Sequence, residues 1–341
     1  MTPLRDAARR TGLAWTPAHT TVVIVAAAVA LGFLPFVKMG LVVNGVFLGA
    51  IIALGAIGLT LIYGILNFAN IAHGDYMTLG AYVVLFIIGN ILARLGVEDS
   101  GLGPFTFGYP LLIALPIAAV AVAALAIALD ISVYRGLRNR GVNVVVVSMA
   151  SLGVAIALRG LVQLIWGGDV QRFPRETRQV FHLPMDVRIP PDAIFIAIVA
   201  IILVTAVYLV LNRSKMGKAM RATADNPDLA LVSGIDTQKV IWWTWAMGAA
   251  LAASAGILMA VFQANFLPIM GWKFLIPLFA AVVLGGVGNP YGALVGAFII
   301  GVTSEVSTQW INPSYKPAVA FLLMIAVLLV RPRGIFGGGR S

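Results

Sequence analysis

Ten apolar runs follow one another along the chain, and only short polar stretches separate them. The runs cover 20–36, 41–66, 70–93, 110–133, 143–166, 193–211, 241–262, 272–287, 291–310 and 317–330. A helix needs about 20 apolar residues to cross a hydrocarbon core of about 30 Å, and several of these runs are shorter. We therefore expect an all-α, polytopic transmembrane bundle with about eight to ten membrane segments, some of them broken or re-entrant. The first run resembles the start of a signal peptide, but we favour an uncleaved span because many spans follow it.

Charge sets the expected orientation. In a soluble protein a net charge of +10 would suggest a nucleic-acid partner, but 60% of these 341 residues are hydrophobic and only 11% are charged. Of the 23 Lys and Arg residues, 14 lie in four segments that ten crossings would place on one side: 1–18, 134–142, 212–240 and 331–341. Short loops rich in Lys and Arg stay in the cytoplasm, so we expect cytoplasmic termini, a lipid bilayer as the surroundings and no nucleic acid.

The domain organisation is correspondingly simple. We expect an N-terminal segment (1–18), one transmembrane domain (19–331) and a cytoplasmic tail (332–341). The chain has no cysteine and only three histidines, which argues against disulfides, thiol chemistry and a metal enzyme. Since no nucleophile elbow, metal spacing or carboxylate pair is visible either, the sequence predicts neither catalysis nor a metal site.

The longest polar interruption on the predicted cytoplasmic side is 212–240, and it carries the signals of two short helices. Ser214 is placed to cap a helix over about 215–224. The second helix has an N-cap, a proline and an acid in its first turn, and a stopping glycine, at Asn226, Pro227, Asp228 and Gly234. Such a loop suits a soluble partner, although a solvated linker that only fixes topology would look similar.

A polar knot interrupts the second and third runs, whose only charged residue is Asp75. A charge at membrane depth costs about 2.5–3.5 kcal/mol, so it faces a cavity or a partner. Asn67, Asn70, His73 and Asp75 either line a path for solute or satisfy backbone groups freed where the helix breaks, which we expect at Gly74. A proton relay through His73 and Asp75 is a third interpretation, but a relay would need further acidic residues across the bilayer.

A glycine-rich break, LGGVGNPYGA, follows the eighth run and contains Gly285, Gly286 and Asn289. The hexapeptides at 79–84 and 295–300, one after each break, match in residue type at every position. Breaks at corresponding places in two halves point to a site near the midplane, although small-residue patterns are also common at membrane helix contacts. The break is not a nucleotide loop because it lacks the Gly-Lys-Ser/Thr end.

Other polar and aromatic residues have plainer expected roles. Asp130 and Glu305 lie near the ends of runs, and Arg159 is placed to extend outward along the fifth run. Three tryptophans at the start of the seventh run are typical of an interfacial belt: Trp242, Trp243 and Trp245.

Four motifs follow one another along the chain: GLTLIYGILNFANIAHGDYMTLGAYV, MGKAMRATADNPDLALVSGI, LGGVGNPYGALVGAFIIG and LLVRPRGIFG. Together they resemble the permeases of branched-chain amino-acid ATP-binding-cassette importers, and most closely the H-type subunit. Many relatives carry Glu where Asp75 stands and a shorter knot, so this chain resembles the neutral amino-acid variants.

The resemblance implies a heteromeric importer in the bacterial inner membrane. The other subunits would be an M-type permease, two cytoplasmic ATPases and a periplasmic solute-binding protein. The segment 224–234 would be the coupling helix that docks on an ATPase, with candidate residues Arg221, Ala224, Asp225, Asn226, Pro227, Asp228 and Gly234. ATP would be bound by the partners, so this chain would need no cofactor, and transport would proceed by alternating access.

Two other functional classes stay open at this stage. An ion-coupled secondary transporter would use His73 and Asp75 as its ion site and would not need the capped loop. A passive channel or a structural membrane subunit is the third class. Within the resembled family, urea and short amides are the main rival substrates.

Overall fold

The computed structural model describes residues 38–97, 102–175, 180–183, 187–332 and 334–336. The predicted first span, the N-terminal segment and most of the tail therefore lie outside the described residues. The elements in order are α3 (Met39–Leu66), α4 (His73–Phe86), η2 (Ile87–Leu92), α5 (Tyr109–Leu129), η3 (Asp130–Tyr134), α6 (Arg135–Asn139), α7 (Val144–Trp166), β1 (Phe181–Leu183), β2 (Val187–Ile189), α8 (Pro191–Arg213), α9 (Lys215–Asp225), α10 (Pro227–Val232), α11 (Thr237–Gln263), α12 (Met270–Gly285), α13 (Pro290–Ser307), η4 (Pro313–Tyr315) and α14 (Lys316–Val330).

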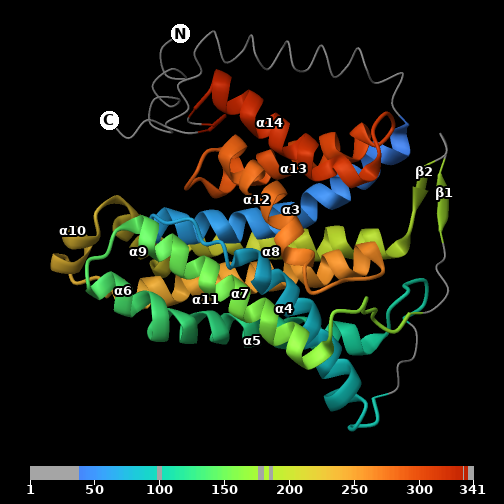
Figure 1. The fold of residues 1–341 in the computed structure, drawn as a ribbon, viewed down its shortest axis with the longest axis horizontal. Coiled ribbons are helices and arrows are strands. Elements are labelled where there is room, and N and C mark those ends of the chain that lie inside the picture. Colours follow the sequence, from blue (N-terminus) through green and yellow to red (C-terminus); the bar gives the residue numbers. More distant parts are fainter. Residues whose placement is uncertain (1–37, 98–101, 176–179, 184–186, 333, 337–341) are drawn as a thin grey trace.

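The expected polytopic helical bundle is confirmed. In the described residues, eight helical segments are long and apolar enough to cross a membrane, and α12 is a shorter apolar helix of 16 residues. The only strands within these residues are β1 and β2, which form a small antiparallel hairpin with Phe181 opposite Ile189. In Figure 1 the hairpin and α10 lie at opposite ends of the bundle, as expected for loops on opposite sides of a membrane.

Helices α3 and α11 form the centre of the bundle, and α3 is buried without interruption from Leu48 to Ile62. The two helices pack on each other, α13 covers α3, and α4 and α5 cover α11. Glycines allow this close packing, which in a membrane replaces the hydrophobic effect as the main attraction between helices. A Cβ built on Gly49 would lie 2.9 Å from the Cα of Phe298, so a side chain there would push α13 away.

Helix α4 begins inside the bundle rather than at its end. Asn67, in the left-handed conformation with φ 55°, ends α3, and the chain is non-helical until α4 begins at His73. The His73 ring lies against the carbonyl of Gly55. Since Gly55 lies 11 residues before the end of α3, this point is about 17 Å up that helix.

The predicted break at Gly74 is therefore wrong by several residues. The non-helical segment precedes Gly74, because Asn67 is the residue that adopts the positive φ and Gly74 is already in the first turn of α4. Gly74 has a packing role instead: a Cβ there would lie 2.4 Å from the carbonyl oxygen of Gly271, in the first turn of α12. The N-termini of α4 and α12 thus meet in the interior.

Candidate functional site

The loop between α8 and α11, called the coupling loop here after its predicted role, is built as its local sequence predicts. The Ser214 hydroxyl accepts from the backbone N–H of Gly217 at 2.9 Å, and α9 begins at Lys215. The Asn226 side chain accepts from the N–H of Leu229 at 2.9 Å and starts α10, with Pro227 as its first residue. These predictions of local structure are confirmed.

The end of α10 is also as expected. Gly234 adopts a φ of +84°, which L-residues with side chains rarely take, and the chain turns there toward α11. Asp228 lies in the first turn of α10, where a negative charge complements the helix dipole. Asp225 is the last residue of α9.

Helix α10 presents apolar side chains to its surroundings. Leu229 is 62% exposed, Leu231 58% and Val232 80%, while Ala230 faces inward and is buried. The loop around them is polar, so these residues are not lipid-facing by composition. An exposed apolar patch on a short capped helix within a polar loop is typical of a surface that binds a partner.

A cavity of about 480 Å³ opens beside this loop, between the ends of α3, α8, α9 and α13. Its lining includes Asn67 and Asn289 from the two sequence breaks, and Arg221 and Ala224 from α9. The Arg221 guanidinium also donates to the backbone oxygen of Leu211, which ties α9 to the end of α8. The cavity therefore joins predicted path residues to predicted coupling residues.

The glycine break lies at this same end of the bundle. Asn289 caps α13 by accepting from the N–H groups of Tyr291 and Gly292. Gly286 has a φ of +106°, and Gly285 packs so closely on Gly292 that a Cβ on Gly285 would lie 2.1 Å from the Gly292 backbone. The break is a tight turn between α12 and α13, and a site near the midplane at the two breaks stays a prediction.

The matched hexapeptides occupy α4 and α13, and in each the glycine lies at a close helix contact. A Cβ on Gly80 would approach Ala253 of α11 at 2.6 Å, and one on Gly296 would approach Ala281 of α12 at 2.2 Å. Close packing accounts for both glycines.

The interior part of the knot contains the other three polar candidates. The His73 Nε2 donates to the Gly55 carbonyl at 2.9 Å, and the ring is fully buried. Asn70 is also fully buried, and within the described residues its amide atoms have no partner in hydrogen-bond geometry. Just before His73, the N–H of Ile71 donates to the Ser151 hydroxyl, which joins this segment to α7.

The Asp75 carboxylate forms an ion pair with Arg159, which we expected from the sequence to extend outward along the fifth run. The Arg159 guanidinium makes three 3.1 Å contacts to the Asp75 carboxylate and lies 4.8 Å from the ring centroid of Trp272. The expectation that Arg159 extends outward is therefore wrong. A buried carboxylate at this depth attracts the guanidinium inward, because an unpaired charge there is far more costly than a paired one.

This arrangement limits the chemistry that the interior can perform. His73 and Asp75 have different partners, a carbonyl and a guanidinium, and neither partner is an acid. Among the described residues, no group of three or more His, Cys, Asp or Glu side chains could hold a metal ion. The observed contacts join helices and give no support to a relay of protons through the knot.

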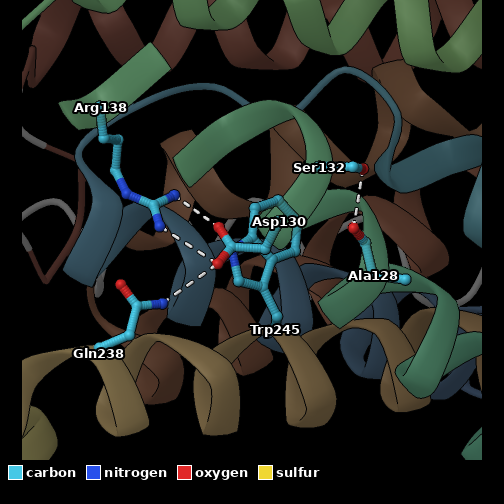
Figure 2. A network of polar contacts seen from close by, with 6 residues as sticks. All are labelled: Ala128, Asp130, Ser132, Arg138, Gln238 and Trp245. Carbon is cyan, nitrogen blue, oxygen red and sulfur yellow. Dashed lines mark hydrogen bonds and ion pairs between the residues drawn. The ribbon is translucent and has the colours of Figure 1, made fainter. Parts of the chain in front are cut away.

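A second buried carboxylate was missed by sequence reasoning. Asp130 is fully buried, and Figure 2 shows Arg138, Gln238 and Trp245 gathered around it. Trp245 is itself fully buried and so does not belong to an interfacial belt, unlike the half-exposed Trp243. A lone acid inside an apolar run, with an arginine eight residues later, is the signal that could have found it.

Comparison with known protein families gives a match to the branched-chain amino acid transport system / permease component family over residues 41–328. The chain belongs to this permease family. It is accordingly a multi-pass membrane protein whose relatives are transport permeases, as the four motifs implied. No solved structure matches the permease.

Three relatives show the range of the family. The permease is 34% identical to the high-affinity branched-chain amino acid transport system permease protein LivH of Escherichia coli (strain K12), over 299 residues that cover 86% of this chain and 94% of the relative. Identity to BraD of Pseudomonas aeruginosa, described in the same terms, is 32% with the same coverage. The autoinducer 2 import system permease protein LsrC of Yersinia enterocolitica is 27% identical over 74% of this chain and 70% of its own length.

Proposed function

We propose that this permease is a membrane-spanning subunit of an ATP-binding-cassette importer for branched-chain or neutral amino acids. It would work with an M-type permease, two cytoplasmic ATPases and a periplasmic solute-binding protein in the bacterial inner membrane. Both termini would face the cytoplasm, together with α9 and α10. ATP would bind to the partners, and this chain would supply the path and the docking element.

The observation that carries the proposal is the exposed apolar face of α10. Leu229, Leu231 and Val232 protrude from a helix that is capped at its start and stopped by Gly234. Fixed ends hold the helix in one shape, so a force applied to it is passed to α9 and α11 instead of being absorbed by bending. This is the construction that a docking helix for an ATPase requires.

The cavity beside α9 is the part of the path that this proposal places nearest to the ATPase. Because Arg221 and Ala224 share its lining with Asn67 and Asn289, displacement of the loop would change its shape. ATP binds more tightly to the closed ATPase dimer, and that difference in affinity would drive the exchange between outward-facing and inward-facing states.

The paired state of Asp75 weighs against an ion-coupled secondary transporter. An ion site needs a carboxylate that is free to bind a cation, whereas this one already faces a guanidinium. Uptake by the purified permease alone under an imposed H⁺ or Na⁺ gradient would contradict the proposal. Uptake that requires both the ATPases and ATP would support it.

Site-directed cross-linking tests the docking surface directly, because the native chain contains no cysteine. We expect Val232→Cys to form a maleimide cross-link to an ATPase subunit in membranes that contain the whole importer. The matched control is Leu95→Cys, which is 72% exposed and follows η2. A cross-link from Leu95→Cys but none from Val232→Cys would refute docking at α10.

The substrate class is tested by uptake into proteoliposomes that contain the complete importer. The names of LivH and BraD suggest branched-chain amino acids, and we expect leucine or a neutral amino acid such as alanine to be transported. Uptake of urea or a short amide without uptake of either amino acid would contradict this part of the proposal.

A further inference from the structure

The Asp130 network joins two parts of the chain that no local sequence pattern connects. The Arg138 guanidinium donates to both carboxylate oxygens, at 2.6 and 3.2 Å. The indole Nε1 of Trp245 donates at 2.9 Å, and the amide of Gln238 at 3.4 Å (Figure 2). Arg138 belongs to α6, whereas Gln238 and Trp245 belong to the first turns of α11.

Helix α11 connects the Asp130 network to the coupling loop, because it directly follows α10 in the chain. Helix α11 begins at Thr237, three residues after the glycine that ends the α10 segment. Helices α9 and α10 both pack against it. Any displacement of α10 therefore reaches the start of α11, and the first buried anchor that it meets is Asp130.

An aromatic cluster continues the connection toward the interior. The rings of Trp245 and Tyr134 are stacked, with centroids 5.0 Å apart and planes 15° apart. Phe68 packs against both, at 5.6 Å from Tyr134 and 6.2 Å from Trp245. Phe68 lies in the non-helical segment that leads to α4, only two residues before Asn70.

Helix α4 begins with buried aromatic side chains of its own. Tyr76, in the first turn of α4, is fully buried, and its ring lies edge-on to His73 with centroids 6.4 Å apart. From Asp130 through Trp245, Tyr134 and Phe68, the side chains that lead toward the start of α4 are all buried. Close packing of this kind transmits displacement because packed protein interiors have few voids that could absorb it.

We infer that Asp130 is a positioning residue that couples movement of α10 and α11 to the start of α4. It does not touch the transported solute. Its carboxylate fixes Trp245 relative to α5 and α6, and Trp245 in turn fixes Phe68 and Tyr134. The inference rests on the proposed docking of α10, and it adds the route by which that docking reaches the interior of the membrane.

A purely structural clamp would show the same contacts, so the test must measure coupling rather than stability. In the reconstituted importer, with leucine and the binding protein present, we expect Asp130→Asn to lower the substrate molecules transported per ATP hydrolysed. The decrease should be at least about fivefold, the lower end of typical coupling between sites. Assembly with the ATPases and ATP hydrolysis without substrate should persist, since neither requires the route to the interior.

Asp192 provides a matched control at the opposite end of the bundle. It is also almost fully buried, and it accepts from the N–H and hydroxyl of Thr106 at 2.9 and 2.6 Å. Asp192→Asn removes the same charge from an equally buried site where, among the described residues, the carboxylate binds Thr106 and makes no hydrogen bond to α11. We expect it to leave the ratio of transport to ATP hydrolysis unchanged, even if it lowers thermal stability.

A second variant tests the same route in case Asp130→Asn does not fold. Trp245→Phe keeps an aromatic ring in the stack but removes the indole donor, and we expect a smaller decrease of the ratio in the same direction. An unchanged ratio in both variants, or an equal decrease in Asp192→Asn, would overturn the inference. Failure of the underlying docking proposal is distinguishable, because the importer with Val232→Cys would then show no cross-link to an ATPase and the unmodified importer would show no ATP-dependent uptake.

Discussion

The coupling loop is stabilised by contacts between residues close in sequence, whereas the bundle interior is stabilised by contacts between residues far apart in sequence. In the loop, three helix starts are capped by side chains that bind an N–H three residues ahead: Ser214, Asn226 and Asp236. In the interior, Arg159 binds Asp75 from 84 positions away, and the Thr78 hydroxyl accepts from Gly271 across 193 positions. Local contacts survive displacement of a whole segment, whereas long-range contacts are broken by it.

This difference suggests how the two regions share the work of transport. The loop can move as a unit because each short helix carries its own caps and depends little on its neighbours for its shape. The interior has to move as packed bodies that switch between discrete arrangements, as is usual for closely packed cores. Variants of the interior should therefore act on the packing of whole helices, and variants of the loop on one helix end alone.

The largest effect is expected from Arg159→Leu. The change leaves the Asp75 carboxylate buried without its cation, and breaking a buried pair in this way costs about 3–5 kcal/mol. We expect a large loss of thermal stability in detergent, measured by size-exclusion chromatography after heating.

Two further variants make this prediction specific. Combined with Asp75→Asn, Arg159→Leu should recover most of the stability, because no uncompensated charge then remains. Arg135→Leu, at an exposed arginine of α6, is the matched control and should have little effect. If Arg159→Leu were as stable as the unmodified permease, the ion pair would not hold α7 to α4.

The next effect is expected from Gly271→Ala. A Cβ at this position would lie 1.7 Å from the backbone oxygen of Gly74, so α4 and α12 would have to separate. Overpacking of this kind costs about 1–3 kcal/mol and sometimes more. The same heating assay measures it, with Gly160→Ala as the control, because a Cβ on Gly160 would meet nothing within 4 Å. Equal stability of the two variants would contradict the close approach.

The difference between contacts near in sequence and contacts far apart in sequence also explains which features could be predicted. The caps at Ser214 and Asn226, the stop at Gly234 and the existence of the long helices depend on residues within one or two turns, and those predictions are confirmed. The pairing of Arg159 with Asp75 depends on how α7 packs against α4, which no local pattern encodes. The burial of Trp245 was missed for the same reason, since its partner Asp130 is 115 positions away.

The position of the breaks was only partly predictable. Composition marked both interruptions, but it could not show that the chain from Asn67 to Ala72 runs back into the bundle while the turn at Gly286 stays at the coupling end. Asn67 and Asn289 therefore share a cavity with Arg221, and His73 and Asp75 lie apart from them. Whether any of these residues contacts solute stays a prediction.

A smaller, local effect is expected in the loop from Asn226→Ala. The change removes the oxygen that accepts from Leu229, and loss of an N-cap costs about 1 kcal/mol. Hydrogen exchange of the backbone in α10 should become faster, while exchange in α4 and α12 should not change. Asn226→Asp keeps a capping oxygen and should preserve protection. Faster exchange that spreads into α4 would show that the loop does not hold its own shape.

The smallest effect is expected at Asp236, and it should depend on pH. The N–H of Lys239 donates to the Asp236 carboxylate at 3.1 Å, and the Lys239 ammonium lies 3.1 Å away. These two contacts, the backbone hydrogen bond first, lower the pKa of Asp236 below its ordinary value. The ionised carboxylate therefore stabilises the start of α11 at neutral pH, and this contribution is lost as the pH falls through the lowered pKa.

Asp236→Ala should accordingly weaken protection of the first turn of α11 at about pH 7 and lose most of its difference from the unmodified permease once the pH lies below the lowered pKa of Asp236. Hydrogen exchange corrected for intrinsic rates measures both. Asp236→Asn keeps an oxygen that can accept from Lys239 but cannot ionise, so its protection should not share the acid-dependent loss. Because the carboxylate is exposed, salt should weaken the ion pair with Lys239 while the hydrogen bond persists. A difference between Asp236→Ala and the unmodified permease that is the same at both pH values would show that charge plays no part in this cap.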